Sequence, residues 1–67
     1  MNVVVNGSER EMRDGATIEE LLRLMELQGA RGVAVARNGD VVLRAQWEQT
    51  PLEPGDRVEV LHAVQGG

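Results

Sequence analysis

Short apolar runs alternate with turn signals along this chain and predict several strands and one helix. The first run, residues 1–5, is rich in β-branched side chains and ends at Asn6-Gly7. Asn-Gly is the strongest two-residue hairpin signal, because both central positions of a type I′ turn require a positive φ. We therefore predict that residues 9–13 return as a second strand. The charged residues around Met12 are typical of a solvated edge strand.

A helix is predicted to begin after Thr17, because Thr17 and Glu20 have the spacing of a capping box. In that motif the hydroxyl of Thr17 accepts the N–H of Glu20, and the carboxylate of Glu20 accepts the N–H of Thr17. Gly29 is the expected stop as a left-handed residue after the last turn, which gives a helix of about eleven residues. The apolar residues that recur on one face of this helix are Ile18, Leu21, Leu22 and Met25.

The hairpin signal recurs after the helix. Residues 32–37 are predicted to be a strand, Asn38-Gly39 the turn and residues 41–43 the partner strand. Residues 44–50 are expected to be irregular with one helical turn. Two prolines, at positions 51 and 54, then mark turns before the next strand.

The last predicted strand spans residues 57–63, with Val58 and Val60 facing the core. One helix can cover only one face of such a sheet, so the first and last strands are expected to lie side by side at its centre, joined by a long crossover. This order predicts an α+β fold of the β-grasp, or ubiquitin-like, type: a mixed sheet of four to five strands with one helix packed on one face. Residues 1–63 would form this domain and residues 64–67 a flexible tail.

Composition limits the chemistry of the 67 residues. There is no cysteine and a single histidine, which excludes a disulfide framework, a catalytic thiol and a thiolate metal site. The formal net charge of −4 opposes nucleic acid, whose binding needs clustered cations. The apolar runs are too short for a signal peptide or a membrane span, so a cytoplasmic protein is expected. We expect no catalytic residue, no metal and no bound cofactor, because the sequence has no paired carboxylates, nucleophile elbow or phosphate loop.

The sequence ends Val64-Gln65-Gly66-Gly67, and the main-chain carboxylate is the candidate reactive group. Glycine has no Cβ, so a diglycine end can thread a channel that is too narrow for side chains. Two terminal glycines also arise by chance or as a cloning scar, so the tail is informative only on a fold known to present one. Extended at roughly 3.3 Å per residue, residues 63–67 would reach about 16 Å from the sheet.

The segments that carry a family resemblance are Val3-Val4-Val5-Asn6-Gly7, Thr17-Ile18, Leu21-Leu22, Val35-Ala36-Arg37-Asn38, Val42-Leu43-Arg44-x-x-Trp47, Leu52-x-x-Gly55-Asp56-x-Val58 and Gly66-Gly67. In this order, over essentially the whole chain, they resemble the ThiS family of sulfur carriers of thiamine biosynthesis. The resemblance implies that Gly67 is adenylated by an ATP-using, ThiF-type enzyme and converted to a thiocarboxylate. A sulfurtransferase or persulfide donor would supply the sulfur, and thiazole synthase would receive it.

Four residues of the last strand are the candidate docking surface for these partners. Leu61 and Ala63 would be outward-facing apolar groups beside the tail, a feature that often marks partner sites, although single exposed apolar residues are common. Glu59 and Arg57 would form the polar rim of this surface.

The two remaining conspicuous residues are interpreted as structural. Trp47, the only aromatic side chain, is expected to pack against the core rather than anchor an interface. His62 follows the core-facing parity of the last strand, and a hydrogen-bonded structural role is preferred there over proton transfer.

Alternative functions stay open at this point. A sulfur carrier of another pathway, such as the small subunit of molybdopterin synthase or a carrier for cysteine or tRNA thiolation, would use the same chemistry. Those relatives tend to be longer and richer in aromatic residues. A non-catalytic ubiquitin-like binding module would leave the terminal carboxylate idle. An RNA-binding β-grasp module would need a basic surface, which this acidic chain lacks.

Overall fold

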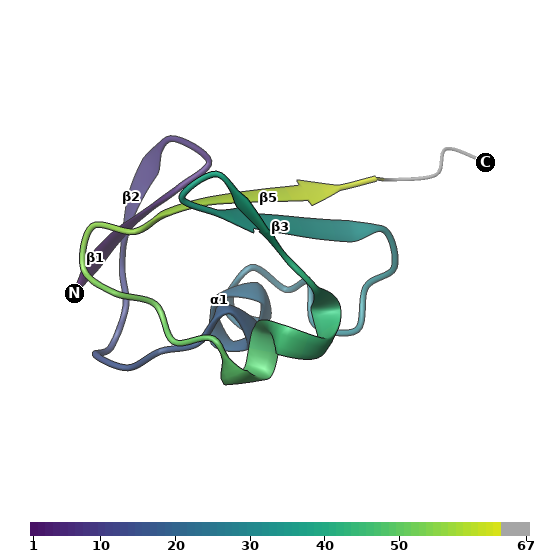
Figure 1. Ribbon diagram of the computed structural model, residues 1–67, viewed down its shortest axis with the longest axis horizontal. Helices are drawn as coiled ribbons and strands as arrows, with labels where there is room; N and C mark the ends of the chain where they lie inside the picture. The colour runs from purple at the N-terminus through teal and green to yellow at the C-terminus, as the bar shows by residue number, and fades with distance from the viewer. Residues whose placement is uncertain (64–67) are drawn as a thin grey trace.

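The computed structural model describes residues 1–63 (Figure 1). Residues 64–67, the predicted tail, lie outside the described residues. The strands are β1 (Asn2–Val5), β2 (Ser8–Glu11), β3 (Val33–Arg37), β4 (Asp40–Val42) and β5 (Arg57–His62), and the helices are α1 (Ile18–Leu24) and the 3-10 helix η1 (Arg44–Gln49). The two described helices have seven and six residues, and neither is long and apolar enough to cross a membrane.

The strands form one mixed five-stranded sheet in the order β2-β1-β5-β3-β4. β1 and β5 are parallel neighbours, while β1–β2, β3–β4 and β3–β5 pair antiparallel. The last strand therefore lies at the centre beside the first, as predicted. Both α1 and η1 lie on the same side of the sheet (Figure 1). The expected layer of one sheet covered on one face is confirmed.

Both hairpins close through the predicted Asn-Gly turns. Asn6 and Gly7 have φ values of 50° and 84°, and Asn38 and Gly39 have values of 50° and 88°. Two consecutive positive values are the mark of a type I′ turn, whose twist matches that of the flanking strands. The charged strand β2 lies at the edge of the sheet, as expected from its solvated sequence.

The helix α1 ends about one turn earlier than the predicted stop at Gly29. Glu26 is the left-handed residue, with a φ of 61°. Its N–H donates to the carbonyl three residues earlier at 3.0 Å, and the N–H of Leu27 donates to the carbonyl of Leu22 at 2.8 Å. These bonds form a Schellman motif without glycine. The early turn lets Leu27 pack against the core, which a prediction from glycine positions does not capture.

Only half of the predicted capping box is present. The Oγ1 of Thr17 accepts the N–H of Glu20 at 3.2 Å. The carboxylate of Glu20 instead pairs with Arg13, whose Nε donates at 2.9 Å and whose Nη2 contacts the second oxygen. These hydrogen bonds lower the pKa of Glu20. The box is incomplete because two bonds to the guanidinium of Arg13 replace the single bond to the N–H of Thr17.

The core lies between the sheet and the two helices and is almost wholly aliphatic. Trp47 is 4% exposed, and its Nε1–H donates to the carbonyl of Val42 at 2.9 Å, so its predicted packing role is confirmed. The helix contributes its predicted face, with Met25 at the margin. The buried side chains are Val3, Val5, Met12, Ala16, Ile18, Leu21, Leu22, Val35, Trp47, Leu52, Val58 and Val60.

A buried carboxylate fixes the entry into β5. Asp56 is 6% exposed. It forms an ion pair with the Nε of Arg37 at 3.0 Å and accepts from the Nδ2 of Asn38 at 3.0 Å and the N–H of Glu53 at 2.8 Å. The next residue, Arg57, donates its N–H to the Oδ1 of Asn38 at 2.9 Å. A buried charge is tolerated only when it is paired and hydrogen-bonded, and this network meets that condition at the start of the strand.

Candidate functional site

The candidate site is the C-terminal end of the chain, and β5 is the strand that leads into it (Figure 1). The predicted modification site Gly67 and the predicted threading residues Val64, Gln65 and Gly66 lie outside the described residues. The structure therefore defines the base from which they continue. That base is β5 and the residue after it, Ala63.

On one side β5 is held by β1 and then by a side chain. Backbone pairing with β1 reaches Val5, opposite Val58. Beyond it the carboxamide of Asn6 takes the place of a further peptide, because its Oδ1 accepts the N–H of Val60 at 2.8 Å and its Nδ2 donates to the carbonyl of Val60 at 3.1 Å. Asn6 therefore satisfies both main-chain groups of Val60. The sequence signal for Asn6 was the turn alone.

On its other side β5 pairs with β3 as far as His62, which lies opposite Val33. One more bond follows, from the N–H of Ala63 to the carbonyl of Gly32 at 2.9 Å. β5 is thus bonded on both sides up to Val60 and on the β3 side up to Ala63. His62 is exposed, because this end of β5 has passed the edge of the core.

The predicted docking residues of β5 lie on the sheet face that α1 and η1 leave uncovered. Arg57, Glu59 and Leu61 alternate with two buried valines, and Leu61 is 68% exposed. Ala63 is also exposed. The parity predicted for this strand is confirmed, whereas a role in docking stays a prediction.

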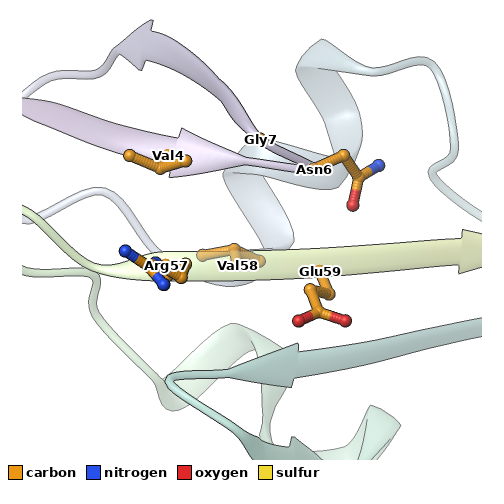
Figure 2. A pocket seen from close by; sticks show the side chains of 6 residues that line it. All are labelled: Val4, Asn6, Gly7, Arg57, Val58 and Glu59. Atoms are coloured by element: carbon orange, nitrogen blue, oxygen red, sulfur yellow. The ribbon is translucent and has the colours of Figure 1, made fainter.

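Near the Asn6-Gly7 turn, Arg57 and Glu59 border a hollow between β1 and β5 (Figure 2). Val4 and the turn line its β1 side. The charged groups at this hollow are the guanidinium of Arg57 and the carboxylate of Glu59. One cation and one carboxylate form a polar rim rather than a reaction centre. Among residues 1–63, no three histidine or acidic side chains are grouped to hold a metal ion.

Sequence reasoning missed three apolar neighbours of Leu61. Ala34 lies directly opposite Leu61, and Val41 lies opposite Ala36. These residues line one shallow hollow on the uncovered face, and Val41 is 74% exposed. We call Ala34, Ala36, Val41 and Leu61 the sheet-face patch. The available signal was the alternation within residues 33–37, whose even-numbered members must face away from the core.

Comparison with known proteins agrees with this geometry. Residues 3–67 match the family model described as the ThiS family. The chain is 31% identical over 67 residues to the sulfur carrier protein ThiS of Escherichia coli, with 100% of both chains covered. The crystal structure of the thiamine biosynthesis protein ThiS from Geobacter metallireducens superposes with a TM-score of 0.82 at 33% identity, again over 100% of both chains. This match confirms the β-grasp fold.

A longer relative is also similar to this chain. The thiazole synthase of Paramagnetospirillum magneticum is 34% identical over 67 residues, which are 100% of this chain and 20% of that protein. The chain therefore spans about a fifth of the length of that relative. A segment similar to this β-grasp unit occurs within a protein named for the synthase.

Proposed function

This chain belongs to the ThiS family of sulfur carriers in thiamine biosynthesis, and we propose that it holds the sulfur on the C-terminal carboxylate of Gly67. It is a carrier and not a catalyst. The observation that carries the proposal is the family match through the diglycine end, over residues 3–67, in a chain without cysteine. No side-chain thiolate is available to hold a persulfide, so the main-chain carboxylate is the remaining position for the cargo.

The carboxylate needs activation because its own oxygen leaves poorly. We assign this step to a ThiF-type adenylating enzyme that uses ATP. An oxygen of the carboxylate attacks the α-phosphorus, pyrophosphate leaves, and the acyl adenylate forms with AMP as a good leaving group. This chain supplies the carboxylate as the substrate group, and the enzyme supplies the catalytic machinery.

Sulfur then replaces AMP at the carbonyl carbon. Sulfide from a donor gives the thiocarboxylate directly. A persulfide of a sulfurtransferase gives an acyl disulfide, which a second thiol reduces to the thiocarboxylate while becoming part of a disulfide itself. The thiocarboxylate is anionic near neutrality, and anionic sulfur is the nucleophilic form.

Thiazole synthase is the proposed acceptor of the sulfur. In Paramagnetospirillum magneticum, a protein of that name contains a segment 34% identical to this chain. We propose that the β-grasp unit reaches the synthase by docking. We place the docking surface on the uncovered sheet face, at Leu61 and Ala63 with Glu59 and Arg57 as a rim, widened by the rest of the sheet-face patch.

The function is tested by incubating the purified chain with ATP and a ThiF-type adenylating enzyme. Pyrophosphate release that depends on the chain, together with an AMP adduct on it, is the expected result. Release that is the same with and without the chain would contradict the proposal.

Leu61→Asp is expected to weaken binding to the adenylating enzyme about tenfold or more without unfolding the chain. Leu61 is 68% exposed, so the substitution removes no core contact, but its carboxylate must be desolvated when the sheet face is covered. Calorimetry measures the affinity. Leu24→Asp is the matched control, because Leu24 is 58% exposed at the end of α1, on the opposite side of the sheet. Equal affinities of the two variants would reduce Leu61 to ordinary surface.

A further inference from the structure

We propose that Gly32 is a positioning residue for the reaction at Gly67, because its main chain holds the peptide from which the tail departs. The inference rests on the proposed function and adds to it a residue of the connection between α1 and β3. Gly32 has no side chain with which to take part in the reaction. It acts through Ala63.

A side chain at Gly32 would crowd Ala63. The carbonyl of Gly32 accepts the N–H of Ala63 at 2.9 Å. A Cβ placed on Gly32 would lie 3.1 Å from the carbonyl oxygen of Ala63 and 3.5 Å from its Cβ. The first distance is shorter than the roughly 3.3 to 3.6 Å of an attractive C–H···O contact. The carbonyl carbon of Ala63 is bonded to Val64, so any residue that displaces this carbonyl redirects the tail at its root.

Gly32 differs in this respect from other left-handed glycines of the described chain. Its φ of +70° alone makes another residue unfavourable. Four other glycines also have a positive φ, but a Cβ on them would meet nothing within 4 Å: Gly7, Gly29, Gly39 and Gly55. Those four glycines serve the backbone conformation of their turns. Gly32 serves its turn and also the close approach to the root of the tail.

The position of the root matters because β5 is held on one side only after Val60. The bonds of Asn6 to β5 end at Val60, and the last bond before the tail is the one from Ala63 to Gly32. Once the sheet face is docked, the partner fixes the distance from Ala63 to the reacting phosphorus. Four residues can span at most about 13 Å, so the position of Ala63 limits where the carboxylate of Gly67 can reach. A Cβ at 3.1 Å displaces its neighbour by a few tenths of an ångström, and because a misplacement of about 1 Å can cost about 100-fold in rate, a loss of about three- to tenfold is expected.

Gly32→Ala tests the inference, with Gly29→Ala as the matched control. Gly29 has a φ of +76°, against +70° for Gly32, and lies in the same connection with open space around its Cβ position. Both variants therefore carry the same backbone strain, and only Gly32→Ala displaces Ala63. With a ThiF-type enzyme and ATP, we expect kcat for adenylation to fall about three- to tenfold in Gly32→Ala. KM for the carrier should change less than kcat, because Arg57, Glu59 and Leu61 of the docking surface keep their places and only Ala63 is displaced, and Gly29→Ala should keep wild-type kinetics.

Amide exchange of Ala63 provides a readout that does not depend on the partner, and it should be faster in Gly32→Ala than in Gly29→Ala. If the alanine variant does not fold, Gly32→Asn and Gly29→Asn replace the pair, since asparagine best tolerates a positive φ while keeping a Cβ. Equal kcat values for the two variants beside an active wild type would overturn the inference alone. An inactive wild-type chain would overturn the proposed function and the inference with it.

Discussion

Deletion of Gly67 is expected to abolish adenylation and thiocarboxylate formation while leaving the melting temperature nearly unchanged. The shortened chain still ends in a carboxylate, but that group stops about 3.3 Å short of the position that the full tail reaches. Among residues 1–63, every buried core residue lies between Val3 and Val60, and we expect the deletion to leave that core intact. Pyrophosphate release and intact mass measure the loss of function, and circular dichroism measures the melting temperature.

Gly66→Val should have a similar effect for a different reason. The length is kept, but a β-branched side chain now stands where the tail enters a channel shaped for glycine. Wild-type turnover by both variants would mean that the reaction does not depend on the end of the chain. A clear drop in the melting temperature that accompanies the loss of activity would mean that residues 66–67 have a structural role instead.

Leu22→Ala is expected to lower the free energy of unfolding by about 2–5 kcal/mol. Leu22 is 1% exposed and lies on α1 against the core. A domain of 67 residues is expected near the low end of the range of about 5–15 kcal/mol for the total. It also has no cysteine for a disulfide, so a loss at the upper end of this range would leave much of the chain unfolded.

Urea denaturation measures this loss, and Leu24→Ala is its control. Leu24 belongs to the same helix but is 58% exposed. The same substitution there should change stability by no more than about 0.5 kcal/mol. Equal midpoints for the two variants would show that the assigned core-facing side of α1 is wrong.

Features that depend on neighbouring residues could be predicted from the sequence. Asn6-Gly7 and Asn38-Gly39 gave the two hairpin turns, because the required positive φ values limit the residue types. The alternation of Val58 and Val60 gave the parity of β5, and with it the exposure of Leu61. Local chemistry alone settles these points.

Several features that depend on particular side-chain contacts across the fold could not be predicted. The end of α1 is set by the burial of Leu27, and the carboxylate of Glu20 is directed to Arg13 by an ion pair seven positions away. The same reason applies at the site. The bonds from Asn6 to Val60 join residues 54 positions apart, and the approach of Gly32 to Ala63 also joins distant segments. Such pairs have no local signal in a single sequence.

The most direct test of the central claim is the position of the transferable sulfur. After incubation with ATP, a ThiF-type enzyme and a sulfur donor, the intact mass should show replacement of one oxygen by sulfur, and fragmentation should place the sulfur at Gly67. A chain extended beyond Gly67 should show no such gain. Transferable sulfur on the extended chain, or at any residue other than Gly67, would contradict the account.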